Sequence, residues 1–242
     1  MAAKQIRTDI PTPKNSLYSR YIKRGLDILL SGMAILILSP VLLVIIILEL
    51  IFHGRPVFYM AERPGKDGKI FKMFKFRSMT NECDENGNLL PAGERITKFG
   101  RILRRASLDE LAGLFNVFNG TMSIIGPRPL LVRYLPLYNE RHRYRHAVRP
   151  GLACWDLNSG DDVTAESWTW NIQFESDIYY VENVSFWLDI RMVFKTVKVL
   201  FAKNEMRTNS DRIGFNGDNL NDTRTRSEIL ADQEHEMAEM QN

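Results

Sequence analysis

The stretch ILLSGMAILILSPVLLVIIIL at residues 28–48 decides how this chain folds. It is apolar almost throughout, and as an α-helix its roughly 21 residues would span about 30 Å, the thickness of the hydrocarbon core of a bilayer. A cleaved signal peptide fits poorly, because the run is too long and the following FHGR at 52–55 offers no cleavage site of small residues. We therefore expect a membrane segment that stays attached.

Two residues, Ser39 and Pro40, interrupt the middle of this run. Pro40 lacks the amide hydrogen that would bond to the Leu36 carbonyl, and its ring crowds that carbonyl, so we expect a strong bend. The Ser39 hydroxyl is able to bond a carbonyl one turn earlier, which makes an interrupted helix tolerable in hydrocarbon. A kinked single span and a re-entrant helix, which returns to the face it entered from, both fit this pattern.

Positive charge on both sides of the run favours the re-entrant form. Residues 20–24 carry three lysine or arginine side chains, and residues 55–77 carry seven. Such residues are enriched on the cytoplasmic side of membrane helices. We predict a re-entrant membrane helix broken at Ser39 and Pro40, with both of its ends cytoplasmic.

Composition describes an ordinary globular chain with one sizeable core, because 45% of its 242 residues are hydrophobic and 25% are charged. Cys83 and Cys154 are far apart and match no metal-ligand spacing, which argues against a disulfide framework and for a reducing compartment. A formal net charge of +3 is too small to indicate nucleic acid. The basic residues are clustered locally, which suits phosphate or anionic lipid.

Short patterns after the membrane run predict a small hairpin followed by helices. Aromatic-rich stretches at 57–60 and 70–76 flank the turn sequence PGKDG, which is typical of two antiparallel strands. Apolar residues recur at helical spacing over 96–118, until Asn119 and Gly120 end the pattern. A clean apolar stripe over 186–201 predicts an amphipathic helix, which either packs in the core or lies at a membrane interface.

The acidic pair in SLDEL, residues 107–111, has a structural and a chemical interpretation. Ser107 followed three positions later by Glu110 matches a capping box, which is a common signal for a helix start. Adjacent helical positions diverge by about 100°, so Asp109 and Glu110 would not face one point. On local grounds alone, capping is the better explanation.

Cations around the pair favour the chemical interpretation. Arg104 precedes it, Lys75 and Arg77 lie on the predicted hairpin, and Arg128 sits in a Pro-Arg-Pro sequence that fixes two φ angles around it. Phosphoryl transfer needs a divalent cation held by one or two carboxylates, together with cations that neutralise charge on the phosphate oxygens. A carboxylate also serves as a nucleophile in such reactions.

These motifs resemble the monotopic phosphoglycosyl transferases of bacteria, from about Arg20 to Lys203. The matching motifs, in order, are KRGLD (23–27), SP (39–40), KFRSM (75–79), TKFGR (97–101), SLDEL (107–111), FNV (115–117), MSIIGPRPL (122–130) and VRPG (148–151). So many ordered matches make chance an unlikely explanation.

The resemblance implies an activity. Such enzymes transfer a sugar 1-phosphate from a UDP-sugar to a polyprenol phosphate such as undecaprenyl phosphate, release UMP and require Mg²⁺. The reaction is the first membrane step of glycoconjugate assembly, at the cytoplasmic face of the bacterial inner membrane. Partners are therefore the UDP-sugar, the polyprenol phosphate and membrane lipid, with no nucleic acid, while an oligomer is compatible with the sequence.

The resemblance also assigns residues. Asp109 would attack the β-phosphate of the donor and form a covalent phosphosugar intermediate, which the lipid phosphate displaces. Glu110 would complete the dyad, and both carboxylates would hold the metal. The substrate-binding cations would be Lys75, Arg77, Arg104, Arg128 and Arg149.

One region departs from the family. After Arg149-Pro150-Gly151 the family continues with Thr-Gly-Trp and then Gln-Val-Asn-Gly-Arg, whereas residues 152–162 here read LACWDLNSGDD. An arginine position has become acidic, which would change the donor, weaken activity or move the contact elsewhere. The loop at 86–91 resembles branches of the family that use modified diacetamido sugars.

Other conspicuous residues have simpler explanations. His142 and His146 are four residues apart, as metal ligands are, but they lie among arginines, which predicts a solvated basic face. Trp155, Trp168 and Trp170 are more typical of a core than of sugar platforms.

The whole chain is thus predicted to be a mostly helical α+β protein, with a re-entrant membrane helix, amphipathic interfacial helices and a small antiparallel hairpin. We divide it into a loose polar leader (1–19), the membrane helix (20–53), a cytoplasmic catalytic domain (54–203) and a polar tail (204–242) that is flexible or binds a partner, helical only at 227–240. Two alternatives stay open. One is a membrane-docked scaffold in which the acidic pair only caps a helix, and the other is a magnesium-dependent hydrolase of UDP-sugars.

Overall fold

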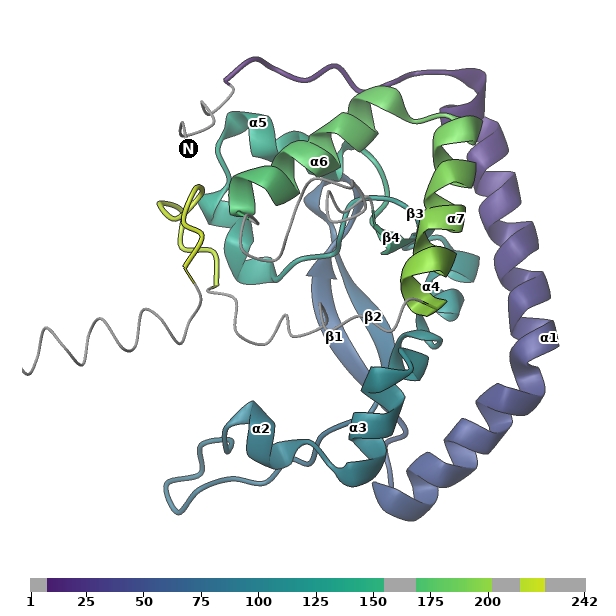
Figure 1. Ribbon diagram of the computed structural model, residues 1–242, viewed down its shortest axis with the longest axis vertical. Coiled ribbons are helices and arrows are strands. Elements are labelled where there is room, and N and C mark those ends of the chain that lie inside the picture. Colours follow the sequence, from purple (N-terminus) through teal and green to yellow (C-terminus); the bar gives the residue numbers. More distant parts are fainter. Residues whose placement is uncertain (1–7, 155–168, 202–213, 225–242) are drawn as a thin grey trace, which may run out of the picture.

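The computed structural model describes residues 8–154, 169–201 and 214–224 and shows a mostly helical α+β fold with a small antiparallel sheet (Figure 1). Its helices are α1 (Lys23–Phe52), α2 (Ala92–Arg95), α3 (Lys98–Arg105), α4 (Gly113–Asn119), α5 (Glu140–Arg143), α6 (Trp170–Asn183) and α7 (Phe186–Phe201). Its strands are β1 (Phe58–Pro64), β2 (Ile70–Phe76), β3 (Ser123–Ile125) and β4 (Gly151–Ala153). A π-helical turn at Tyr18–Ile22 leads into α1, and 3-10 turns occupy Lys66–Gly68, Leu108–Glu110, Val132–Leu137 and Tyr144–Ala147.

Helix α1 continues through Ser39 and Pro40 instead of breaking there. The Ser39 hydroxyl donates a 2.7 Å hydrogen bond to the Leu36 carbonyl, which is the acceptor that Pro40 leaves without an amide. This bond replaces the missing one and keeps the helix continuous, although α1 changes direction along its length in Figure 1.

Most of the middle of α1 is uncovered. Within the described residues, the helical segment Tyr18–Phe52 is the one helix long and apolar enough to cross a membrane. Leu36 and Ile37 are each 74% exposed. Apolar side chains exposed to this degree along one helix are typical of contact with lipid.

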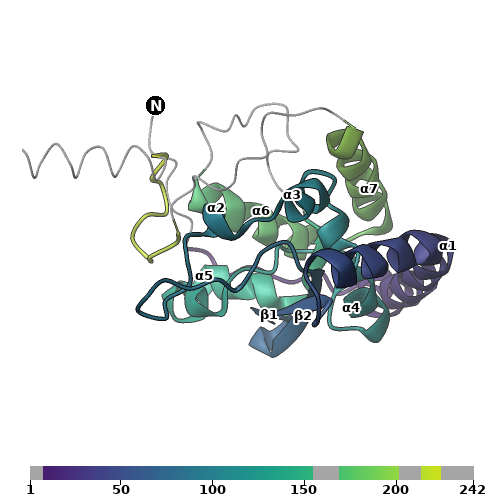
Figure 2. The same cartoon turned by 90° about the horizontal axis from the view of Figure 1, so that it is seen from below.

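Both ends of α1 are joined to the rest of the protein. At its start, the Lys23 ammonium lies 2.6 Å from the Asp189 carboxylate of α7, and the Asp27 carboxylate accepts a hydrogen bond from the Ile124 amide. Just after its end, the His53 ring bonds the buried Glu49 carboxylate at 2.9 Å and the Thr97 hydroxyl at 2.7 Å. Figure 2 shows α1 passing alongside α4 between these two anchors.

The predicted hairpin is confirmed, with β1 and β2 antiparallel in a register that runs from Phe58 opposite Phe76 to Pro64 opposite Ile70. The face that carries Met73 packs on Val117 of α4 and on Met122, which follows that helix, and both of these residues are fully buried. A second pairing, parallel between β3 and β4, joins Gly126 and Gly151 so closely that a Cβ on either would overlap the backbone of the other. Both elements hold α4 between them.

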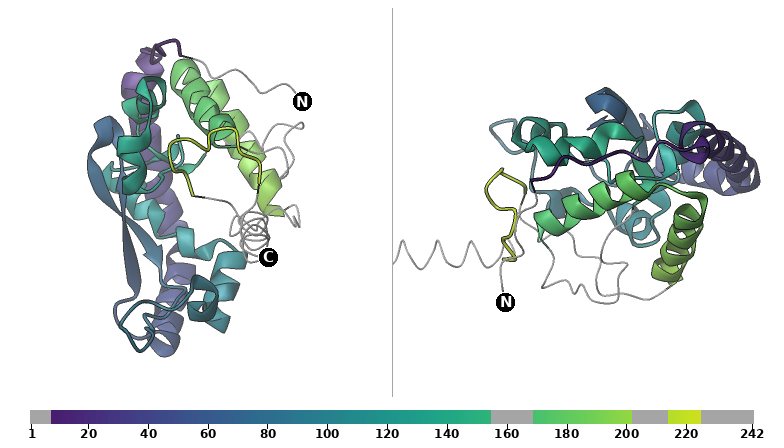
Figure 3. Two further views of the ribbon diagram at one scale, coloured as in Figure 1. Left: turned by 90° about the vertical axis from the view of Figure 1, so that its left-hand side faces the viewer. Right: turned by 90° about the horizontal axis from the view of Figure 1, so that it is seen from above.

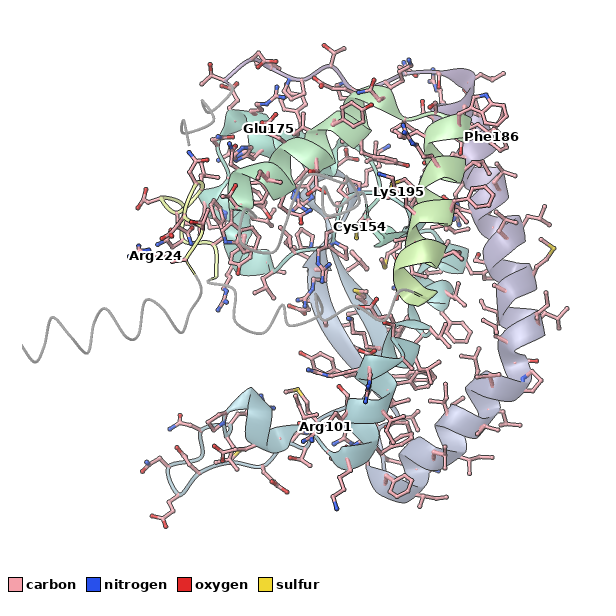
Figure 4. All side chains as sticks on the ribbon, in the orientation of Figure 1. Arg101, Cys154, Glu175, Phe186, Lys195 and Arg224 are labelled. Carbon is pink, nitrogen blue, oxygen red and sulfur yellow. The ribbon has the colours of Figure 1, made fainter. Side chains whose placement is uncertain are left out.

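Three helices follow the predicted apolar periodicity. The pattern over 96–118 becomes α3 and α4, separated by a turn, and Gly120 ends α4 with φ at 92°. Helix α7 buries Leu188 and Met192 in the core, but Trp187 is 77% exposed and Phe194 is 71% exposed. Phe186 lies where α7 begins, beside the first turns of α1, and its ring meets that of Tyr18 edge-on at 5.9 Å (Figure 4).

The leader is more ordered than its composition suggests. From residue 8 onward it crosses α6 and runs to α1 (Figure 3). The Lys14 amide bonds the Val181 carbonyl at 2.9 Å, and Asp9 accepts from the Arg141 guanidinium at 3.0 Å. This part of the leader therefore contacts the catalytic domain through hydrogen bonds, although it forms no helix or strand over residues 8–16.

The tail also packs in part. Phe215 is only 4% exposed, and it lies among the rings of Tyr134, Tyr138, Trp170 and Phe174. The Asn171 amide bonds the Leu220 carbonyl at 2.8 Å. Residues 214–224 of the tail are therefore joined to the catalytic domain through one aromatic side chain and a backbone hydrogen bond. The predicted helix at 227–240 lies outside the described residues.

Two arginines and a histidine of the arginine-rich segment 141–149 are buried rather than solvated. Arg141 and Arg145 are 2% and 1% exposed, and they pair with Glu175 and Asp177 of α6 at 2.7 and 2.6 Å. The prediction of a solvated basic face fails because these acids lie more than thirty positions away in the sequence. Trp170 packs in the aromatic cluster as expected, while Trp155 and Trp168 lie outside the described residues.

Burial also changes the two histidines of this segment. Burial, together with the smaller effect of the nearby Arg145 cation, lowers the pKa of His142 and of His146 to about 4. The ring of His142 packs on Phe174 with centroids 4.7 Å apart, and among the described residues neither of its nitrogens has a hydrogen-bond partner. Both imidazoles are therefore neutral parts of the core at neutral pH.

Acid should destabilise this domain between about pH 6.5 and pH 4, because the unfolded chain takes up protons at its histidines that the folded chain excludes until about pH 4. His142→Phe should reduce this dependence by about 1.4 kcal/mol per pH unit within that range, since one such site is removed. The free energy of urea unfolding, measured from pH 4 to pH 8, checks this. Equal pH dependence in wild type and variant would contradict it.

Candidate active site

Contacts at both ends of α3 fix Arg104 beside Ser78, which follows the hairpin. The Thr97 hydroxyl caps α3 by accepting the Gly100 amide at 2.8 Å. Gly100 packs directly on the backbone of Ser78, where any Cβ would overlap the Ser78 carbonyl. One turn later, the Arg104 Nε donates to the Ser78 hydroxyl at 2.7 Å. The close approach that glycine allows therefore sets the position of the arginine.

The acidic pair lies in a single 3-10 turn, Leu108–Glu110, between α3 and α4. Ser107 has a left-handed backbone with φ at 54°, and its side chain makes no cap hydrogen bond. The predicted capping box is therefore not formed, because an N-cap residue needs an extended backbone. Helix capping consequently does not explain these two acids.

The two carboxylates occupy different surroundings. Residues in a 3-10 helix diverge by about 120°, so neighbours point to different sides. Asp109 is only 9% exposed, whereas the side chain of Glu110 is 43% exposed and its carboxylate pairs with the Lys75 ammonium at 2.9 Å. The pair thus consists of one buried and one solvent-facing acid, as its adjacency predicts.

Burial raises the pKa of Asp109. The nearby Lys75 lowers that pKa, Glu110 raises it and Arg104 lowers it. A desolvated carboxylate with few water molecules to displace is a stronger nucleophile once ionised, and the two cations favour its ionised form. The structure thus brings together four of the predicted residues: Lys75, Arg104, Asp109 and Glu110.

The turn that carries Asp109 rests on the apolar helix. Ala112, which follows the turn, is buried in one cluster with Leu42 and Ile45 of α1, and Leu108 and Leu111 pack against the same cluster. The buried carboxylate is therefore attached to the second half of α1 through a shared core.

Two other predicted cations lie in different places. The Arg77 guanidinium donates to the carbonyls of His53 and Pro56, in the segment after α1. Arg149 donates to the Gly120 carbonyl at 2.8 Å, past the end of α4, whereas the acidic pair precedes its start. In the structure both arginines hold backbone, and Arg149 lies at the opposite end of α4 from Asp109.

Arg128 belongs to the loop between β3 and the 3-10 turn Val132–Leu137, and its side chain is exposed. Its neighbour across the loop is Arg63 of β1, whose pKa is lowered by burial and also by Arg128. Arg63 shares a face of the hairpin with Tyr59, and Tyr59 pairs with Lys75 on the neighbouring strand. Arg63 is four positions after Tyr59 on its strand, so it lies about 13 Å along this face from Lys75, the residue that contacts the acidic pair.

Sequence reasoning overlooked Arg63, although its alternation with Tyr59 and Ala61 was a usable signal. The hairpin face thus has Lys75 near one end and Arg63 with Arg128 near the other.

A metal would have to share this site with substrate. Among the described residues, no group of three or more His, Cys, Asp or Glu side chains could hold a metal ion. Mg²⁺ commonly uses only one or two protein carboxylates and completes its shell with phosphate oxygens and water. Asp109 and Glu110 are oxygen donors of this kind, and because they point to different sides of the turn, phosphate oxygens and water would have to fill most of the metal's shell. The divergent residues 155–162 lie outside the described residues.

A buried carboxylate among cations, beside an apolar helix, is suited to phosphate chemistry next to a membrane. Comparisons with known proteins identify the family: the chain matches the bacterial sugar transferase family over residues 18–203. It is 41% identical over 201 residues to the uncharacterized sugar transferase EpsL of Bacillus subtilis (strain 168), covering 81% of this chain and 98% of that protein.

Two relatives carry more specific names. The UDP-N-acetylgalactosamine-undecaprenyl-phosphate N-acetylgalactosaminephosphotransferase of Aeromonas hydrophila is 35% identical over 203 residues, 82% of this chain and 47% of that protein. The UDP-glucose:undecaprenyl-phosphate glucose-1-phosphate transferase of Escherichia coli (strain K12) is 39% identical over 189 residues, 74% of this chain and 40% of that protein. The chain belongs to the bacterial sugar transferase family, and it spans less than half the length of these two relatives.

Substitutions around Asp109 should move its pKa in opposite directions. Lys75→Met should raise it, because a neighbouring cation is lost, and Glu110→Gln should lower it, because a neighbouring anion is lost. Carboxyl ¹³C NMR titration of Asp109 measures both shifts. Arg77→Met serves as a matched control that removes a hairpin cation engaged elsewhere, and shifts of the same sign in the first two variants would contradict the arrangement.

Proposed function

We propose that this protein transfers a sugar 1-phosphate from a UDP-sugar to a polyprenol phosphate at the membrane surface and releases UMP. The observation that carries the proposal is Asp109, a buried carboxylate flanked by Lys75 and Arg104 on a turn that packs against the apolar helix α1. The two named relatives act on UDP-sugars and undecaprenyl phosphate according to their names, which supports the same substrate classes here.

The proposed reaction has two displacements at one phosphorus atom. The Asp109 carboxylate attacks the β-phosphorus of the donor, and the bond to the bridging oxygen breaks, so that UMP leaves with that electron pair. An oxygen of the polyprenol phosphate then attacks the same phosphorus and releases the Asp109 carboxylate. Lys75 and Arg104 neutralise charge on the phosphate oxygens in both steps.

The remaining residues would bind and orient the donor. Asp109 and Glu110 would hold Mg²⁺, which when bound neutralises the charge of the diphosphate. Arg128 and Arg63, about 13 Å along the hairpin face, would hold the nucleotide end. Glu110 is exposed enough to meet the incoming lipid phosphate, while its contact with Lys75 orients it.

We also infer that α1 is re-entrant. A single span would need the Lys23–Asp189 contact and the His53–Thr97 contact on opposite sides of a membrane, although both join α1 to one domain. A re-entrant helix leaves both contacts on the cytoplasmic face, where UDP-sugars are made available. Its most exposed apolar residues, Leu36 and Ile37, then reach deepest into the lipid.

Activity should depend on both the lipid and Asp109. Wild type should release UMP over many turnovers from a panel of UDP-sugars only with polyprenol phosphate and Mg²⁺ present, and without the lipid it should release at most one equivalent of UMP per enzyme. Asp109→Asn should lower the rate by at least about 10³-fold, since a nucleophile is lost. Asp67→Asn, a matched change in the hairpin turn, should keep full activity. Mass spectrometry after incubation without lipid should find a phosphosugar on Asp109.

Two outcomes would contradict the transferase assignment. Turnover that does not depend on the lipid would favour a hydrolase of UDP-sugars. Absence of UMP under every condition would favour a membrane-docked scaffold.

Cysteine accessibility should report both ends of α1 on the same face. In a chain with Cys83 and Cys154 replaced by serine, Arg20→Cys and Arg55→Cys should react with an impermeant maleimide from the cytoplasmic side only. Ile37→Cys should be protected from both sides, because its position lies in lipid. Labelling of the two ends from opposite sides would refute the re-entrant helix.

A further inference from the structure

The buried ion pair between Arg145 and Asp177 makes hydrogen bonds to the backbone of the exposed Arg128. Arg145 is 1% exposed and Asp177 is fully buried, and their closest atoms are 2.6 Å apart. Both Nε and one terminal nitrogen of Arg145 donate to the same carboxylate oxygen of Asp177, while the other terminal nitrogen donates to the Tyr138 hydroxyl at 2.8 Å. The guanidinium is therefore held in one orientation.

Each member of this pair also bonds the main chain of Arg128. Arg145 donates to the Arg128 carbonyl at 2.6 Å, and the second carboxylate oxygen of Asp177 accepts from the Arg128 amide at 3.4 Å. Pro127 and Pro129 flank this residue, and each fixes its own φ angle. The backbone of Arg128 is therefore fixed, and its exposed side chain extends from that fixed backbone.

Arg145 has no direct route to a substrate, because a side chain with 1% of its surface exposed cannot reach one. A contribution to stability does not by itself explain the pair, since well-packed apolar residues of similar volume often stabilise a core as much as a buried ion pair does. What apolar residues would not supply is the pair of hydrogen bonds to Arg128. Those bonds fix the backbone that carries the Arg128 guanidinium, which is near enough to Arg63 to lower the pKa of that residue.

We propose that Arg145 and Asp177 are positioning residues that hold Arg128 for the nucleotide end of the donor. This inference rests on the proposed function. The pair acts on donor binding and leaves the phosphoryl chemistry at Asp109 untouched. Their removal should therefore raise KM for the UDP-sugar and change kcat and the KM for polyprenol phosphate little.

The decisive variant replaces the ion pair by apolar residues, Arg145→Met with Asp177→Leu, which leaves no unpaired charge in the core. We expect KM for the UDP-sugar to rise about tenfold, with kcat within about threefold of wild type. The matched control is Arg141→Met with Glu175→Leu, a second pair between α5 and α6 that does not bond Arg128 (Glu175 is labelled in Figure 4). The control should leave KM for the donor unchanged.

A double-mutant comparison separates positioning from general packing. In an Arg128→Ala background, the apolar pair should raise KM no further, because the residue on which it acts is gone. An equal rise in that background, or an unchanged KM in the first variant, would overturn the assignment. Thermal unfolding verifies folding, and Arg145→Lys, which keeps the charge but loses the forked hydrogen bonds, is the substitute if the apolar pair does not fold.

The failure of this inference is distinguishable from failure of the proposed function. Wild type that releases no UMP in the lipid-dependent assay would overturn both, because the role of Arg128 depends on the reaction. If wild type is active and the apolar variant has the same KM for the UDP-sugar, the positioning role alone would be overturned.

Discussion

Lys23 at the start of α1 and His53 just after its end are bonded to one and the same domain, through Asp189 and Thr97. A helix of 30 residues is about 45 Å long, so these two contacts fix α1 to the domain at points far apart along the helix. The second anchor continues into α3, because Thr97 also caps that helix, and α3 carries Arg104. The position of the apolar helix and that of the reactive site are therefore set by the same few contacts.

The site combines two opposing electrostatic effects. Burial disfavours the charge of Asp109, while Lys75 and Arg104 favour it, and the balance leaves a carboxylate that is poorly solvated yet close to cations. Glu110 cannot take the same part, because its side chain is 43% exposed and paired with Lys75. Adjacent acids thus differ in role because a 3-10 turn gives them different neighbours, not because their chemistry differs.

Patterns of short range in the sequence predicted the hairpin, α3 and α7, because alternation and helical periodicity are local properties. The prediction of a capping box was wrong because the residue types of that motif do not reveal the left-handed backbone of Ser107. The burial of Arg145 was not predictable, since its acidic partner lies on another helix. Family motifs located Asp109, but they did not show that Arg149 holds the far end of α4. The parallel pairing of β3 with β4 was missed because three residues carry too little pattern.

The segment around Phe215 packs on the domain although it lies outside the residues that match the family. The family match ends at residue 203, yet Phe215 fills an aromatic cluster with Tyr134 and Phe174, and the leader at Asp9 bonds Arg141 before that match begins at residue 18. A fragment cut to the shared limits would expose the rings of that cluster to water and leave the Arg141 guanidinium short of one acceptor. The packing contacts of this protein therefore extend beyond both ends of the region that matches the family.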